Sequence, residues 1–120
     1  MKPQEMVEEF HRKYGVYQEP HPELPSNHLV VGRIRLLLEE ASELAKAFHE
    51  DDIEQVADAL ADLAYIVYGT AAICGIQLDP VIAEVHRSNM TKEPGDFKPR
   101  KGPAYDPPRI WDVLGNQNGQ

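Results

Sequence analysis

The sequence contains one cysteine and no apolar run long enough to cross a membrane. Because Cys74 is the only cysteine among 120 residues, an intrachain disulfide is excluded, and its apolar surroundings favour a buried core thiol. The apolar stretch from Leu63 to Ile76 is shorter than the roughly 20 residues that a membrane span needs. The polar N-terminus, MKPQEMVEEF, does not resemble a signal peptide, so a cytoplasmic protein is expected.

Positive charge is also scarce. The chain has 12 Lys and Arg against 20 Asp and Glu, which gives a formal net charge of −8. So acidic a surface argues against non-specific binding of nucleic-acid polymers, which needs a positive field. The same charge favours a metal ion as the mediator of contact with any anionic substrate.

Helical periodicity with clear start and stop signals predicts an all-α protein of four helices in one domain over residues 1–110. No internal repeat and no strand pattern is present. Each expected helix opens at a capping residue or a proline, or closes at a glycine. The expected ranges are Pro3 to Tyr14, Ser26 or Asn27 to about His49, Asp51 or Asp52 to about Cys74, and Asp79 to about Met90.

The two long helices each carry an apolar stripe at helical spacing, which predicts their core faces. The stripes are Val30, Ile34, Leu37, Ala41, Leu44 and Phe48 on one helix, and Ile53, Val56, Ala57, Leu60, Ala64, Val67 and Ala71 on the other. Further apolar residues, such as Leu38 and Ile66, lie outside these stripes. Because two short outer helices cannot cover them all, the sequence predicts a homodimer or a higher homo-oligomer.

A second stripe on each long helix carries acids. Glu39, Glu40 and Glu43 lie near the end of the first helix, and Asp58 and Asp62 lie near the start of the next. Antiparallel packing would bring these carboxylates level, and such hard oxygen ligands suit Mg²⁺ or Mn²⁺. The alternative is a pair of solvated helix faces, which is the usual role of charged helix surfaces.

A ferritin-like di-iron site is a third interpretation of the acids. Such sites need a Glu-x-x-His motif on two helices. Glu84 and His86 are only two residues apart and therefore face different ways, so this type of site is excluded.

The composition changes after Thr91. Five prolines forbid regular helix in the segment from Lys92 to Arg109. Its five basic and three acidic residues give +2, which leaves −10 on the rest of the chain. A basic segment of this kind could fold over an anionic ligand or be strapped to the acidic surface. Residues 111–120 are expected to form an apolar anchor followed by a disordered end.

Five stretches, in this order between Glu9 and Ile110, resemble the MazG-like all-α nucleoside triphosphate pyrophosphohydrolases. They are EFHRKYG, LLLEEASEL, DALADLAYIVYGTA, GIQLDPVIAEVHRSNMTK and KGPAYDPPRI. This superfamily includes phosphoribosyl-ATP pyrophosphohydrolases and dimeric dUTPases, and the dUTPase-like branch looks closest. The resemblance implies Mg²⁺-dependent cleavage between the α- and β-phosphates, which releases a nucleoside monophosphate and pyrophosphate.

The resemblance also implies roles for particular residues. Glu39, Glu40 and Glu43 match the family's EExxE motif. Asp62 matches the end of its ExxD motif, but Ala59 stands where the first Glu is expected. The neighbouring Asp58 is the candidate replacement. The implied metal ligands are therefore Glu40, Glu43, Asp58 and Asp62, with Glu39 as the base that activates water.

Substrate contacts are implied as well. Asn89 and Lys92 match an SNxxK-like phosphate motif. Tyr65, on the acid-bearing stripe, would contact the sugar or base, or pack in the core. His11, beside Phe10, would line the site or lie at its boundary. Two alternatives are phosphoribosyl-ATP hydrolysis and a catalytically inactive helical binding module, the latter favoured by Ala59 alone.

Overall fold

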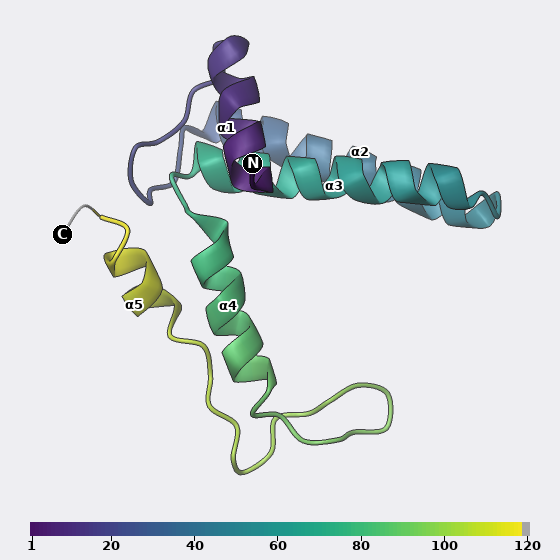
Figure 1. Ribbon diagram of the computed structural model, residues 1–120, viewed down its shortest axis with the longest axis vertical. Helices are drawn as coiled ribbons and strands as arrows, with labels where there is room; N and C mark the ends of the chain where they lie inside the picture. The colour runs from purple at the N-terminus through teal and green to yellow at the C-terminus, as the bar shows by residue number, and fades with distance from the viewer. Residues whose placement is uncertain (119–120) are drawn as a thin grey trace. The chain divides into compact units, whose positions relative to one another are not determined.

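The computed structural model describes residues 1–118, and its regular elements are helices (Figure 1). Within these residues there is no strand, only a single antiparallel bridge between Glu93 and Arg100. The predicted all-α class is confirmed. The chain forms two compact units, one over residues 1–76 and one that begins at Gln77. The helices are α1 (Pro3–Lys13), α2 (Asn27–His49), α3 (Ile53–Ile73), α4 (Leu78–Asn89) and α5 (Ile110–Gly115).

Capping explains where the two long helices begin. The Ser26 hydroxyl accepts a hydrogen bond from the Leu29 N–H, and the Asp52 carboxylate accepts from the first turn of α3. Helix α4 begins at Leu78, one residue before the expected start, and has no side-chain cap. The sequence did not predict α5, a single short helix that follows the prolines.

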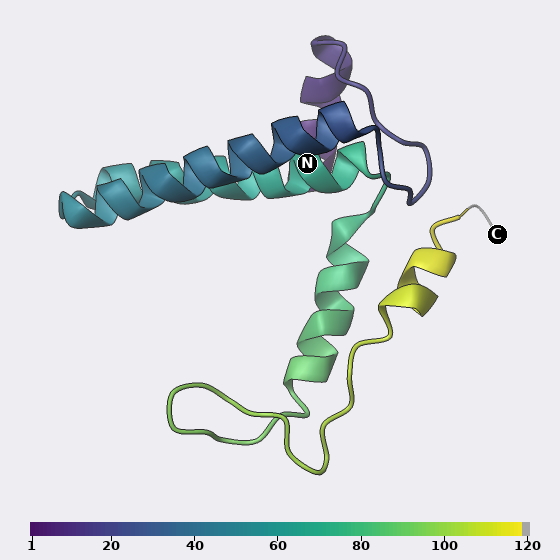
Figure 2. The same cartoon turned by 180° about the vertical axis from the view of Figure 1, so that it is seen from behind.

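In the first unit, α2 and α3 form an antiparallel hairpin and lie alongside each other in both views (Figure 1, Figure 2). Their contact is made by small side chains: Ala47 and Ala59 are buried together with Val56, and Leu44 packs against them. Small residues let two helix backbones approach closely. By length and composition alone α3 could cross a membrane, a property that the core helices of soluble proteins share.

The stripes predicted as core faces are largely uncovered in the single chain. Ile34 is 52% exposed, Phe48 59% and Ile53 82%. The prediction was only partly right, because Ala47 and Ala59, which lie outside the stripes, share the hairpin contact with the stripe residues Leu44 and Val56. Helix α1 covers only one end of the hairpin, where it packs on α3. Two apolar faces of the hairpin therefore remain open.

The loop between α1 and α2 is fixed to the C-terminal end of α3. The Glu19 N–H donates to the Ile73 carbonyl at 3.1 Å, and the Glu23 N–H donates to the Cys74 carbonyl at 2.9 Å. Gly75 ends α3 as predicted, with a φ of +68°, and a Cβ there would collide with the His21 carbonyl. The turn after α3 thus needs glycine, and it holds the segment that follows α1 in place.

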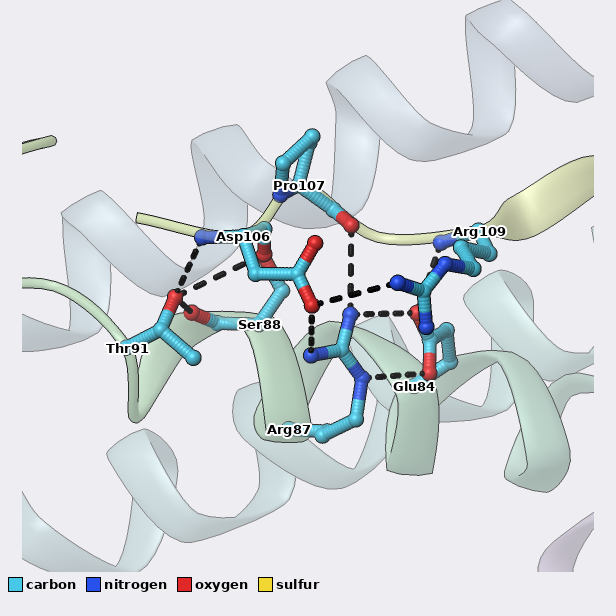
Figure 3. A network of polar contacts seen from close by, with 7 residues as sticks. All are labelled: Glu84, Arg87, Ser88, Thr91, Asp106, Pro107 and Arg109. Atoms are coloured by element: carbon cyan, nitrogen blue, oxygen red, sulfur yellow. Dashed lines mark hydrogen bonds and ion pairs between the residues drawn. The ribbon is translucent and has the colours of Figure 1, made fainter. Parts of the chain in front are cut away.

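In the second unit, an ion-pair network ties the proline-rich segment to α4 (Figure 3). The Arg87 guanidinium donates to both carboxylate oxygens of Glu84 at 2.9 Å and to Asp106 at 2.9 Å. The Arg109 backbone N–H donates to Glu84 at 2.6 Å. Both acids therefore link the end of α4 to residues just before α5.

Hydroxyl groups complete this attachment (Figure 3). Ser88, only 2% exposed, donates to the Asp106 carbonyl at 2.8 Å, and the Asp106 N–H donates to the Thr91 hydroxyl at 2.8 Å. Beyond α5, the Gln117 side chain bonds both backbone groups of Gln77. Residues 119 and 120, the end of the predicted disordered tail, lie outside the described residues.

The network gives a pH prediction. Hydrogen bonds from Arg87, together with the Arg109 N–H, lower the pKa of Glu84 to about 2. Its stabilising contribution is complete above the ordinary Glu pKa of about 4.3 and is lost as the pH falls towards about 2. We expect the Asp106 amide resonance of the native protein to shift within this window as the attachment loosens. In Glu84→Gln, the Asp106 amide resonance should already have the shifted position at neutral pH. Identical spectra for both proteins would contradict the role given to Glu84 in this attachment.

Candidate functional site

Four of the five predicted acids line one pocket of about 220 Å³ between α2 and α3. Five of its lining side chains are carboxylates, and only one is cationic. The lining residues are Glu40, Glu43, Lys46, Ala47, Glu50, Gln55, Asp58, Ala59 and Asp62. The antiparallel hairpin brings the end of α2 level with the start of α3, as the sequence predicted.

Crowding of negative charge is visible at Glu40. Desolvation raises the pKa of this half-buried carboxyl, and the charges of Asp62, Glu43, Glu39 and Asp58 raise it further. All four neighbours act in the same direction, because each disfavours a further negative charge. A bound cation would relieve this repulsion.

The structure separates Glu39 from the other predicted acids. Glu40, Glu43, Asp58 and Asp62 all line the pocket, whereas Glu39 is exposed and does not. Its charge still reaches Glu40. The geometry thus groups the four expected metal ligands and leaves the expected base on the solvent side of α2.

The departure from the ExxD motif lies at a helix contact. Ala59 is 6% exposed, belongs to the small core with Ala47 and Val56, and also forms part of the pocket wall. Asp58 precedes it and lines the same pocket, one helical turn from Asp62. A carboxylate is therefore present beside the position where the motif lacks one.

The donor set fits a hard divalent cation in kind. Carboxylate oxygens are the ligands that Mg²⁺ and Mn²⁺ take in proteins, and four such groups line one solvent-accessible pocket. Within residues 1–118, no three Asp, Glu, His or Cys side chains are arranged closely enough to enclose an ion.

The sequence analysis missed Lys46, Glu50 and Gln55, which line the same pocket. Their spacing was a usable signal. Lys46 and Glu50 lie three and seven residues after Glu43, and Gln55 lies three before Asp58, so each shares a helix face with a predicted ligand.

A second pocket, of about 360 Å³, lies in the same unit. Its walls are mostly apolar and aromatic, and its lining residues are Phe10, His11, Val16, Arg33, Leu36, Tyr65 and Ile66. Leu36 is one helical turn from Glu40, and Tyr65 is one turn from Asp62. The aromatic pocket is therefore the next feature along the hairpin from the acidic pocket.

Two predicted substrate contacts, Tyr65 and His11, meet in this aromatic pocket. The Tyr65 ring stands edge-on to Phe10 with ring centroids 5.6 Å apart. His11 is 3% exposed, and its Nδ1 lies 3.1 Å from the Gln18 Oε1. Because an amide oxygen can only accept, Nδ1 carries the hydrogen. Burial lowers the pKa of His11, which favours the neutral ring, and in that form Nε2 is an acceptor.

Arg33 is a second polar group in this pocket, and the sequence analysis did not single it out. Its Nε donates to the Thr70 hydroxyl at 3.2 Å, and its Nη2 donates to the Ile66 carbonyl at 3.1 Å. Desolvation lowers the pKa of this half-buried guanidinium. None of the ion pairs found in the described part of the chain includes it. A basic residue on the acid-bearing stripe was the signal for it.

Asn89 and Lys92 belong to the second unit. Asn89 is exposed at the end of α4, and the Lys92 N–H donates to its carbonyl at 3.2 Å. Lys92 lines a basic hollow together with Lys98, Pro99, Arg100 and Lys101. This concentration of cations is suited to anions, and the phosphate-binding role of both residues stays a prediction.

Comparison with known proteins identifies the family. Residues 7–89, well over half of the chain, match the family described as phosphoribosyl-ATP pyrophosphohydrolase. The chain is also 37% identical over 79 residues to uncharacterized protein L479 of Acanthamoeba polyphaga mimivirus. That match covers 61% of this chain but only 31% of the viral protein. With its helical fold and paired acids, the chain belongs to the phosphoribosyl-ATP pyrophosphohydrolase family of nucleotide-hydrolysing enzymes, within the MazG-like all-α superfamily.

Proposed function

We propose that the protein is a Mg²⁺-dependent nucleoside triphosphate pyrophosphohydrolase, with a deoxynucleotide or a non-canonical nucleotide as its substrate. The observation that carries the proposal is the single pocket lined by Glu40, Glu43, Asp58 and Asp62 from two helices. The adjoining aromatic pocket supplies a place for a base. Mn²⁺ has the same ligand preferences and is an alternative ion.

The acidic residues would have two roles, metal binding and activation of water. Glu40, Glu43, Asp58 and Asp62 hold the ion, which when bound neutralises and polarises phosphate oxygens. Glu39 orients water and accepts its proton. As the water oxygen bonds to phosphorus, the anhydride bond between the α- and β-phosphates breaks, and pyrophosphate leaves.

Groups outside the acidic pocket would bind the rest of the nucleotide. Lys92 and Asn89 contact phosphate oxygens, Lys92 as a point charge and Asn89 as a neutral donor. Tyr65 and His11 contact the base or the sugar from the aromatic pocket. These residues bind the substrate and take no part in breaking the phosphate anhydride bond.

A second candidate substrate, phosphoribosyl-ATP, is favoured by the family match itself. A panel of ribo- and deoxynucleoside triphosphates, non-canonical nucleotides and phosphoribosyl-ATP separates the two, with pyrophosphate release measured with and without Mg²⁺. Turnover confined to phosphoribosyl-ATP would favour the second candidate. No turnover of any compound would favour an inactive binding module.

We propose further that two copies associate through the open faces of the α2–α3 hairpin. Ile34, Phe48 and Ile53 are each more than half exposed, and a second copy would remove this apolar surface from water. Sedimentation at micromolar concentration should therefore show no folded monomer, and the melting temperature should rise with protein concentration. A compact monomer whose melting temperature does not depend on protein concentration would refute the proposed dimer.

Glu43→Gln tests the metal assignment. The amide keeps the shape of the side chain and removes one charge, so the fold should be at least as stable without metal. Pyrophosphate release should fall by about 100-fold or more, because charge stabilisation at a reacting centre is commonly of this size. Glu5→Gln, on the exposed side of α1, serves as the control and should retain full activity. Unchanged Mg²⁺ affinity in Glu43→Gln would remove Glu43 from the ligand set.

Asp58→Asn tests whether Asp58 replaces the missing motif glutamate. If it does, Mg²⁺ binding and activity should fall nearly as far as in Asp62→Asn. A surface acid without such a role should change activity less than about twofold. Adding Ala59→Glu to Asp58→Asn should restore Mg²⁺-dependent release, since the position lines the pocket. Because Ala59 is also buried, a melting curve must accompany this variant.

A further inference from the structure

Arg33 has more hydrogen-bond donors than its protein contacts use. A guanidinium carries five N–H donors, and the Thr70 hydroxyl and the Ile66 carbonyl engage two of them. Within residues 1–118 no buried side-chain nitrogen or oxygen lacks a partner, so Nη1, which makes neither of these contacts, is accessible to solvent. A half-buried cation with free donors and no carboxylate beside it is a recognition group for an acceptor.

The backbone of α3 makes room for this group. A Cβ on Gly69 would lie 2.6 Å from Arg33 Nη2 and 3.3 Å from His11 Nε2. Glycine at this position therefore lets both side chains lie against the helix. The two contacts with α3 fix the guanidinium, so little side-chain freedom remains to be lost when a ligand binds.

Arg33 and His11 give the aromatic pocket a donor and an acceptor. Phe10, Tyr65 and Leu36 supply flat or apolar surface, while Arg33 can only donate and the neutral His11 presents Nε2. An apolar pocket with two polar groups of opposite kind matches a nucleobase edge that carries a carbonyl oxygen beside an N–H. Arg33 lies seven residues before Glu40, about 10 Å along the helix. It therefore faces the part of a base far from the phosphates.

We propose that Arg33 determines base specificity by donating to an exocyclic carbonyl oxygen, so that 6-oxopurine or 4-oxopyrimidine nucleotides are preferred. The inference rests on the proposed nucleotide substrate. The adjacent ring N–H of such a base donates to His11 Nε2. An exocyclic amino group in the same place would meet donors that cannot accept its hydrogens, and this mismatch disfavours adenine and cytosine.

The test compares ligands with and without that carbonyl oxygen, whose removal also removes the adjacent ring N–H. Calorimetry measures the binding of inosine monophosphate against purine riboside monophosphate, and of uridine monophosphate against its 4-deoxy analogue. The native protein should bind the oxo member of at least one pair about 10- to 100-fold more tightly, the usual range for a hydrogen bond to a charged group. Arg33→Met should lose most of the preference and keep only the part that comes from the ring N–H and His11, and Arg33→Lys should retain more of it. Thr70→Val, which removes one anchor and no ligand donor, is the matched control and should keep most of it.

Three results would overturn the inference: no monophosphate binding, equal affinities in the native protein, or a preference that is undiminished in Arg33→Met. If Arg33→Met does not fold, NMR spectroscopy of the native protein provides the test. Its Arg33 side-chain N–H resonances should shift with inosine monophosphate and not with purine riboside monophosphate. An Arg33-dependent preference without any triphosphate turnover would sink the pyrophosphohydrolase proposal alone. Turnover without an Arg33-dependent preference would sink this inference alone.

Discussion

The close contact between α2 and α3 positions every acid of the candidate site. Ala47 and Ala59 carry the smallest side chains that can fill a helix contact, and they let the two backbones approach at the level of Glu43 and Asp62. Carboxylates on both helices then crowd one pocket, and the pKa of Glu40 rises in response. Like charges held this close cost stability unless a cation or a proton offsets them. The same contact therefore forms the core of the hairpin and creates the charge crowding that the proposed metal ion would relieve.

The use of alanines at this contact leaves the larger apolar residues elsewhere. Ile34, Phe48 and Ile53 point away from the hairpin contact and stay uncovered in one chain. A two-helix hairpin has more apolar surface than its single seam can bury, and α1 covers only the end near Ile73. This is the physical reason for the proposed second copy. The acidic pocket itself is formed within one chain.

Along the hairpin, the character of the surface changes within a single helical turn. Glu40 and Asp62 line the acidic pocket, whereas Leu36 and Tyr65, one turn further on, line an aromatic one. Helix α1 makes this change possible, because it brings Phe10 and His11 against α3. A nucleotide has the same division between a charged phosphate end and a flat base. The two adjoining pockets therefore match the two ends of one molecule.

The sequence by itself determined the four longer helices and the acids that meet in one pocket. Caps such as Ser26 and Asp52, and the stop at Gly75, are local effects that hydrogen bonding and φ angles settle within a few residues. Glu40, Glu43, Asp58 and Asp62 were found from spacing because an antiparallel hairpin allows few other arrangements.

Only the tertiary structure decided which face of each helix is buried. On a helical wheel of α2, Ile34 and Phe48 are larger and more apolar than Ala47 and therefore look like better core residues. In the structure the small Ala47 is buried at the hairpin contact, because it allows close packing of the two helices. The burial of His11 against Arg33 and Gly69 joins three helices, and no local pattern specifies such a contact. The attachment of Asp106 to Arg87 likewise joins residues that are distant in sequence. A contact between separate segments depends on the shapes of both segments. Local sequence patterns describe one segment at a time, so they do not specify which segment it will pack against.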